Sequence, residues 1–598
     1  RPSDHLRAAC PLCFGGSRPV LEHGGPDIIV CLDANFQQKR RKSKFTDPKV
    51  SFTGGAFVSA ERVSKMENIV QTRRQGSVGR RNPARASKVS QLGDDVLDEC
   101  ESSFVAAQEK VAKASKNYYA DTGLMACLCR HDRVLFLVNM TSVGEKQYNA
   151  MALLDTLKDE LPDDWTVGVL YDIACQLSRS VEKARYGFLD TFSDRISWAV
   201  SVFHAYGHQW ACQVLFHPRK CEGFGRSDGE GCERFWSCIR KMVPVLRVTG
   251  YHRRMFLLDR QVKHIHEDGL PRLCVWLSRR HADSQTALLE AEKRLAVLGL
   301  SEAELQLLWK AQVNAQTRKP ERKKQNAADM KIDQILVELS DWSERKAEVV
   351  QRKAALKRKM NSLSSAQTDA ETDKISTEDR ELKSWRKHIG DKMAALGELN
   401  QRKLRDLKGN PYLRARINAR ALRSNIRSSV VAHKFERARL ERHFRAQIQQ
   451  NRDHEQAKEA VHRREKGLNR MIASYNALVS QMEELAKAGK APTRRVITPR
   501  RIDPRQLFRL DVDDEIWQED PGLGPQDEES RPRWETDPAV REGIQLMLQL
   551  KRAREEMERI THEVRALLEW VDEEISVLAS AAETCSGGED IVIQLSKS

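Results

Sequence analysis

The chain has 598 residues, with 101 Lys and Arg against 85 Asp and Glu, and a net charge of +16. This length allows several domains. The excess of positive charge suggests a polyanionic partner, nucleic acid before membrane, but it is equally typical of a solvated basic surface. No apolar run approaches the roughly 18 residues that a membrane span needs, so we expect no membrane association. Thirteen Cys in so long a chain exclude a disulfide scaffold and indicate a reduced protein.

The first cysteines, Cys10 and Cys13 in "CPLC", have the spacing of half a structural zinc site. Two sets of residues are candidates for the other half. One is Cys129 with His131. The other is His204, His208 and Cys212, which share one face if that stretch is helical. The alternatives remain open that these cysteines are buried hydrophobic residues, and that His204 and His208 contact phosphate or position a nucleophile.

The next segments predict a sheet. "PDIIVCLDANF" indicates a buried strand with Asp33 at its end, and "GLMACLCRHDRVLFLVNM" indicates two strands joined by a tight turn at 130–133. A helix follows in "GEKQYNAMALLDTLKDELP", then a strand in "WTVGVLYDIACQ" with Asp172 at its carboxyl end, and another in "RISWAVSVFHAYG". A helix begins in "GEGCERFWSCIRKMV". This order predicts an RNase H-like α/β catalytic core, a mixed sheet with flanking helices.

In such a fold the first and fourth strands are neighbours, so Asp33 and Asp172 would lie close together, with Glu233 or Glu230 as a third acid from the last helix. Three converging carboxylates repel one another unless cations neutralise them, and two Mg²⁺ or Mn²⁺ ions suit oxygen ligands. Such a pair of ions supports in-line phosphoryl transfer. Taken singly, an Asp after a strand is usually a turn residue and a Glu in a first helical turn usually favours the helix dipole, so only the ordered set of acids indicates a site.

Several long blocks closely resemble the KDZ (Kyakuja–Dileera–Zisupton) transposases, among them "DIIVCLDANFQQKR", "VGVLYDIACQLSRS" and "FHAYGHQWACQVLFHPRKCEGFGRSDGEGCERFWS". The resemblance spans roughly residues 7–280. It implies a DDE-type transposase that cleaves and transfers strands of double-stranded DNA, at the terminal repeats of an element and at a target. The family's acids fall on Asp33, Asp172 and a glutamate, for which Glu233 is favoured over Glu230. Moving a DNA element requires its two ends to be held together, so we expect a homo-oligomer on DNA, and we expect the protein in the nucleus.

Basic runs predict contacts with DNA phosphates at Lys39, Arg40 and Arg41, and at Arg73, Arg74, Arg80 and Arg81. A nuclear-localisation signal is the alternative for the first run. Beyond residue 280, Ala, Leu, Glu, Lys and Arg at helical spacing predict long amphipathic helices, packed as helical hairpins or coiled coil.

These patterns divide the chain into six regions. They are a zinc-knuckle-like start with the first strand (1–33), a basic and partly irregular insertion (34–115), the rest of the catalytic core (116–282), a helical or coiled-coil arm (283–490), a Pro-rich linker (491–536), and a C-terminal helix with its tail (537–598). Two other functions remain open: a domesticated, catalytically silent DNA-binding or scaffold protein, and an RNase H-like nuclease without strand transfer.

Overall fold

The computed structural model divides the chain into two compact units, residues 1–319 with 532–598, and residues 320–531. The residues described are 1–50, 55–75, 91–92, 94, 96–98, 100, 118–142, 144–182, 192–317, 327–359, 365–395, 409–444, 451–491, 498–499, 501–504 and 532–585. Unit 1 therefore holds the predicted core together with the first helices of the predicted arm and the C-terminal helix. Unit 2 is inserted into it along the sequence.

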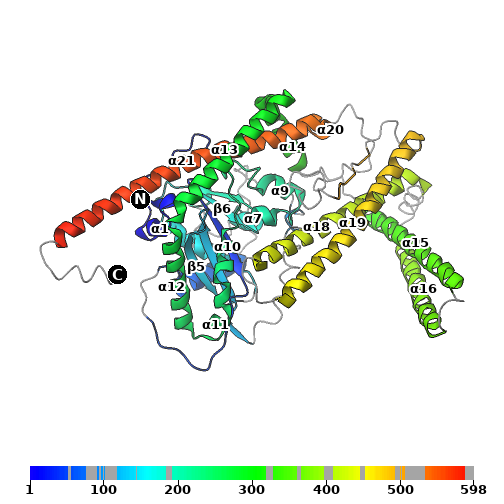
Figure 1. Ribbon diagram of the computed structural model, residues 1–598, viewed down its shortest axis with the longest axis horizontal. Coiled ribbons are helices and arrows are strands. Elements are labelled where there is room, and N and C mark those ends of the chain that lie inside the picture. Colours follow the sequence, from blue (N-terminus) through cyan, green and yellow to red (C-terminus); the bar gives the residue numbers. More distant parts are fainter. Residues whose placement is uncertain are drawn as a thin grey trace. The chain divides into compact units, whose positions relative to one another are not determined.

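Unit 1 is built around a mixed five-stranded sheet in the order β5-β4-β1-β6-β7 (Figure 1). Its strands are β1 (Ile28–Asn35), β4 (Gly123–Cys129), β5 (Val134–Met140), β6 (Val167–Tyr171) and β7 (Ile196–Ala199). β4 pairs antiparallel with both β1 and β5, whereas β1, β6 and β7 are parallel. The predicted order of strands and helices in this region is confirmed, although the last strand is shorter than expected and ends at Ala199. A second, two-stranded sheet pairs β2 (Arg40–Arg41) with β3 (Tyr119–Asp121).

Two hydrophobic cores cover the two faces of the large sheet. Alternate residues of a strand point to opposite faces. Val30 and Leu32 accordingly belong to the first core, and Ile29 and Cys31 to the second. Because both faces are covered, β1 is an uninterrupted apolar run up to Asp33. The helices on these faces are α1 (Asp4–Ala9), α2 (Pro11–Phe14), α3 (Ala60–Gln75), α6 (Gln147–Asp159), α7 (Ala174–Glu182), α8 (Val202–Ala205), α9 (Trp210–Phe216), α10 (Gly231–Ile239), α11 (Val243–Val248) and α12 (Tyr251–Gly269).

Long helices and one short one complete unit 1. The long ones are α13 (Arg272–Leu298), α14 (Glu302–Thr317) and α21 (Pro538–Cys585), and the short one is α20 (Arg533–Thr536). α13 ends at Leu298 and is capped by Gly299, whose positive φ of 65° is usual at the end of a helix. α13 and α21 pack along each other although unit 2 separates them in the sequence, and α21 also contacts α2 near the N-terminus (Figure 1). The apolar stripe of the C-terminal helix is therefore covered within the chain over its first half, where Leu546, Met547 and Leu550 are buried.

Unit 2 consists of paired long helices. α15 (Ala327–Lys359) packs on α16 (Ser365–Ala394), and α18 (Pro411–Phe444) packs on α19 (Asn451–Lys487). α18 begins at a proline, and the side chain of Asn410 caps it by accepting from the amides of Tyr412 and Leu413 at 3.0 and 3.2 Å. These pairs agree with the predicted helical hairpins. None of the described helices in either unit combines the length and the hydropathy that a bilayer span requires.

Candidate active site and cysteine–histidine clusters

The register of the two central parallel strands places the two candidate aspartates side by side. Leu32 of β1 lies opposite Tyr171 of β6. Asp33 and Asp172, the next residue in each case, therefore occupy adjoining positions at the carboxyl edge of the sheet. The alternation of side chains points both toward the second core, which α10 covers. Both aspartates are only partly buried, so a ligand can reach them.

α10 brings a third carboxylate and a hydrogen-bond donor to this edge. Glu233 lies in its first turn, and one turn later the indole Nε1 of Trp236 donates to Oδ2 of Asp33 at 2.6 Å. Burial raises the pKa of Asp33 well above its usual range, and the charges of Asp172, Glu233 and Glu145 raise it further. The predicted acids are thus close enough to repel one another. Glu145 was not predicted, because it lies in a loop before α6 with no pattern around it.

Asp172 has its own set of partners. Its Oδ1 accepts a hydrogen bond from Ser201 Oγ at 3.3 Å and lies 2.6 Å from Nδ1 of His204. Burial alone would lower the pKa of His204, but its ion pair and hydrogen bond with Asp172 outweigh burial and raise the pKa to about 9. His204 therefore stands beside the carboxylates as a cation, and not among the cysteines.

Glu230 is the residue immediately before α10, and its carboxylate lies near His204 and Asp172. Its Oε1 accepts from the backbone amide of Phe203 at 3.1 Å. Burial raises its pKa to about 7, with the charge of His204 opposing the shift and that of Asp172 adding to it. Gly229 has a φ of 78°, and a Cβ there would lie 3.0 Å from both the side chain of Leu170 and the hydroxyl of Ser201. Glycine at this position therefore lets the loop approach β6 closely enough to present the glutamates.

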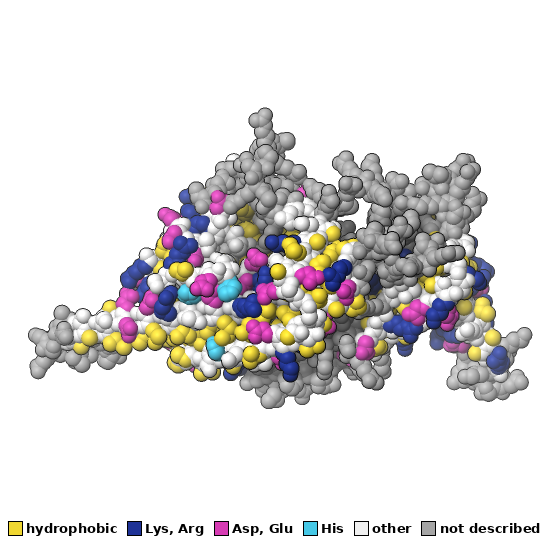
Figure 2. All heavy atoms as spheres, turned by 90° about the horizontal axis from the view of Figure 1, so that it is seen from above, with side chains coloured by type: hydrophobic (Ala, Val, Ile, Leu, Met, Phe, Trp, Pro, Cys, Tyr) yellow, Lys and Arg dark blue, Asp and Glu magenta, His cyan; other side chains and the backbone are white. Residues whose placement is uncertain are grey.

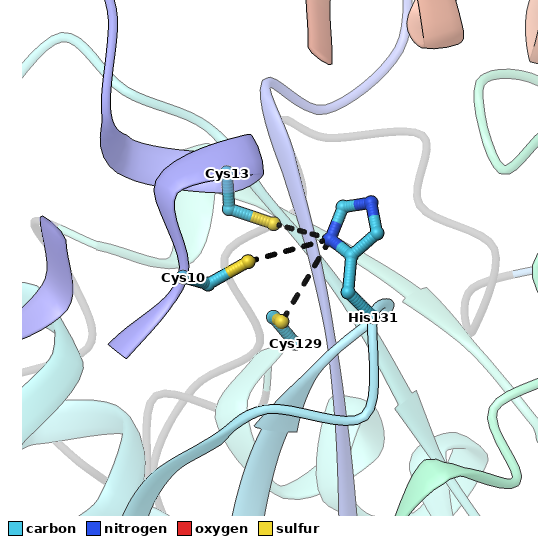
Figure 3. A group of neighbouring side chains, drawn as sticks. All are labelled: Cys10, Cys13, Cys129 and His131. Carbon is cyan, nitrogen blue, oxygen red and sulfur yellow. Dashed lines mark hydrogen bonds between the residues drawn. The ribbon is translucent and has the colours of Figure 1, made fainter. Parts of the chain in front are cut away.

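The first cysteine–histidine cluster combines Cys10, Cys13, Cys129 and His131 (Figure 3). Nδ1 of His131 lies 3.5, 3.2 and 3.9 Å from the three Sγ atoms in that order. The first of the two pairings predicted for "CPLC" is therefore the one found. Three thiols and an imidazole whose ligand atoms lie within 4.8 Å of one another could hold a structural zinc ion.

A carboxylate from the other end of the chain lies behind this histidine. Nε2 of His131 is 3.2 Å from Oε2 of Glu563, which α21 supplies. The neighbouring Arg130 is fully enclosed and pairs with Glu556 at 2.6 Å and with Glu563 at 3.2 Å. A metal-binding histidine typically donates its second ring nitrogen to such a carboxylate.

The second cluster combines Cys100, Cys175, His208 and Cys212. His208 and Cys212 were predicted as zinc ligands for the other cluster, whereas Cys100 and Cys175 were not predicted at all. Nδ1 of His208 lies 3.6 Å from Sγ of Cys175 and 3.5 Å from Sγ of Cys212. Its Nε2 faces the backbone oxygen of Asp172 at 2.8 Å.

The candidate phosphate-binding residues have different surroundings. Arg40 pairs with Asp121 at 2.5 Å, and both side chains are nearly buried, so its guanidinium joins β2 to β3 and is not presented to a phosphate. Lys39 is partly buried over the ring of Tyr119 at 5.3 Å, while Arg41 is exposed. Arg73 and Arg74 lie in α3 with side chains outside the described part, and Arg80 and Arg81 lie outside the described residues.

Comparison with known families agrees with this geometry. Residues 26–266, the span that carries the sheet, the carboxylates and the second cluster, match the model of a transposase family. The family is KDZ, the Kyakuja-Dileera-Zisupton transposases, and the match confirms the resemblance predicted from the sequence. Such a family implies a nucleic-acid-processing enzyme with DNA as its partner. No curated protein and no solved structure matches the chain.

Proposed function

We propose that the chain is a DDE-type DNA transposase, in which Asp33, Asp172 and Glu233 catalyse cleavage and transfer of DNA strands. The observation that carries the proposal is the meeting of the two aspartates on adjoining parallel strands, with Glu233 close enough to raise the pKa of Asp33. A sheet edge that gathers like charges is costly, and such sites are functional more often than ordinary surface carboxylates are.

The sheet order supports an RNase H-like core. An antiparallel β5-β4-β1 half is followed by parallel β6 and β7, and the acids come from the end of β1, the end of β6 and a later helix. The same arrangement was the reason for expecting Asp33, Asp172 and a glutamate to lie close together.

The residues present suit divalent cations. All the donors at the cluster are carboxylate oxygens, which Mg²⁺ and Mn²⁺ prefer, and their mutual repulsion is what bound cations would relieve. Two such ions would supply activation of the attacking oxygen and stabilisation of the leaving oxygen. The protein's own contribution is to orient the ligands, since Trp236 holds Asp33 while Ser201 and His204 hold Asp172.

Glu233 is the better candidate than Glu230 for the third acid. Glu233 acts on Asp33 directly, whereas Glu230 has one oxygen engaged by the amide of Phe203. The charge of Glu230 favours the protonated form of His204, whose pKa it raises, and the charge of Glu233 acts in the same direction.

The decisive experiment is a strand-cleavage and strand-transfer assay with Mg²⁺ or Mn²⁺, on DNA that carries the ends of the element. Asp33→Asn, Asp172→Asn and Glu233→Gln should each abolish both steps while the protein stays folded. Asp163→Asn is the control, since this fully exposed carboxylate lies before β6, at the opposite end of that strand from Asp172. Cleavage without transfer would support the nuclease, and DNA binding without either step would support the domesticated protein.

Assembly into a homo-oligomer follows from the need to hold two DNA ends together. On α21, Val564, Leu568, Val571, Ile575 and Leu578 recur at alternating intervals of four and three residues, as in a coiled-coil seam. Leu568, Ile575 and Leu578 are 59%, 59% and 62% exposed, and Figure 2 shows hydrophobic side chains along this projecting end of the helix. We assign this seam to a second copy of the chain, because such a repeat is complementary to itself. We expect the assembled protein to act in the nucleus.

A further inference from the structure

We propose that Cys100, Cys175, His208 and Cys212 bind a zinc ion, and that this ion positions the Asp172 carboxylate through His208. The first half of the proposal stands by itself. The second half rests on the proposed function, because it assumes that Asp172 belongs to the cation-binding cluster.

The distances in the cluster fit tetrahedral zinc. Zinc bonds of about 2.0 Å to nitrogen and 2.3 Å to sulfur give an N···S edge of about 3.5 Å in a tetrahedron. Nδ1 of His208 lies 3.6 Å from Sγ of Cys175 and 3.5 Å from Sγ of Cys212. The fourth ligand is Cys100, whose Sγ also accepts the backbone amide of Gln209 at 3.5 Å.

Ordinary packing does not account for this arrangement. Buried free cysteines often serve as small hydrophobic residues, and all three cysteines here are buried and unpaired by disulfides. Cysteines in that role have no reason to converge on one imidazole nitrogen from three separate places in the chain. A shared metal ion supplies that reason, because it binds thiolates and a neutral imidazole nitrogen.

The second nitrogen of His208 connects the cluster to the candidate active site. When Nδ1 binds a metal, Nε2 carries the proton, so it donates to the backbone oxygen of Asp172 at 2.8 Å. Cys175, at the start of α7, lies only three residues beyond Asp172. The turn after β6 is therefore held at two points. Cys175 follows the turn as a zinc ligand, and His208 donates a hydrogen bond to Asp172, the first residue of the turn.

The other cluster provides an internal comparison. His131 of the first cluster has Glu563 of α21 behind it, and its ring nitrogens face Cys10, Cys13, Cys129 and Glu563 rather than the candidate carboxylates. Loss of metal from the first cluster should therefore leave the carboxylates in place, whereas loss from the second should disturb them.

The test uses the purified full chain and two measurements, zinc content by mass spectrometry and the affinity for Mn²⁺ by calorimetry or electron paramagnetic resonance. Wild type should hold two zinc ions per chain. Cys100→Ser and Cys13→Ser should each hold one, but only Cys100→Ser should bind Mn²⁺ at least tenfold more weakly. The zinc site at Cys100 would be overturned by either of two results. One is a single zinc ion in wild type that Cys100→Ser retains, and the other is two zinc ions in Cys100→Ser.

His208→Cys separates positioning from folding. This variant keeps four zinc ligands but has no donor for the oxygen of Asp172, so it should retain two zinc ions and still bind Mn²⁺ about tenfold more weakly. Wild-type Mn²⁺ affinity in His208→Cys, with zinc retained, would overturn the positioning role. Asp33→Asn serves as the reference for the cation site. If Asp33→Asn leaves Mn²⁺ binding unchanged, both the proposed carboxylate site and the positioning role of His208 are wrong. The zinc content then still tests the zinc site by itself.

Discussion

The imidazole of His131 and the carboxylate of Glu563 lie 3.2 Å apart, although one belongs to the turn between β4 and β5 and the other to the C-terminal helix. The contact joins a cysteine–histidine cluster near the N-terminus to α21. It makes the C-terminal helix part of the surroundings of that cluster.

Glu563→Gln should weaken zinc binding at the first cluster about 10- to 100-fold, because the carboxylate behind a ligating histidine orients the ring and increases its basicity. Competition with a chelator, followed by zinc counting, measures this. Glu574→Gln, an exposed residue on the same helix, should behave as wild type. Equal zinc retention in the two variants would contradict a role for Glu563 at the metal.

Glu556→Gln should destabilise unit 1 by about 3 to 5 kcal/mol, because it leaves Arg130 buried without its main counterion. Denaturant unfolding measures the loss. Glu542→Gln is the matched control, since it removes an exposed ion pair with Arg294 that is worth at most about 1 kcal/mol.

The same pair predicts a dependence on pH. Although burial opposes it, the charges of Arg130 and Arg280 hold the pKa of Glu556 well below its usual range. A carboxyl whose pKa is lower in the folded state adds stability above its unfolded pKa, and that stability declines as the pH falls below it. The acid-induced loss of stability should therefore be smaller in Glu556→Gln than in wild type. If wild type and Glu556→Gln lose the same stability at low pH, the ionised carboxylate of Glu556 is not what stabilises the packing of α21.

Neighbouring arginines should differ in their effect on DNA binding. Arg41→Gln should reduce the slope of log affinity against log salt by about one, because one phosphate contact is lost. Arg40→Gln should instead lower stability by about 3 kcal/mol, because it leaves Asp121 unpaired in a nearly buried site. A reduced salt slope in a folded Arg40→Gln protein, with no change in Arg41→Gln, would reverse these assignments.

The exposed seam of α21 should control the oligomeric state. Leu568→Glu combined with Ile575→Glu should convert the protein to a monomer in light scattering, because two charges enter an apolar contact. Val297→Glu, at an 84% exposed position of α13, should leave the assembly intact. A wild-type protein that is monomeric with and without DNA would remove the seam from the interface.

Some parts of the site could be predicted from sequence because they follow local patterns. Asp33 and Asp172 each come after a short buried strand, and the order of elements makes those strands neighbours. The "CPLC" motif identified half of a cluster, but its partner depended on whether Cys129 or Cys212 comes near, which only the fold decides. Cys100 and Cys175 stand alone in sequence, without the paired spacing that indicates a metal.

The role of α21 was hidden for a different reason. Its buried face carries charges at helical spacing, namely Arg552, Glu555, Glu556, Arg559 and Glu563. In the sequence such a charged stripe is typical of a solvent-exposed face, since charges are buried only when each has a partner. Here the partners lie in the core. Arg559, for example, donates to the backbone oxygens of Pro26, Asp27 and Gly223 at 2.8 to 3.0 Å.

Because unit 2 is inserted between α14 and α20, the ribosome completes every strand of the sheet long before it makes α21. Until then the nascent chain holds Arg130 without Glu556, and His131 without Glu563. A message cut short anywhere within unit 2 would encode the whole carboxylate cluster. It would lack α21, whose Glu556 neutralises the buried Arg130. The full stability of unit 1 should therefore require translation through α21.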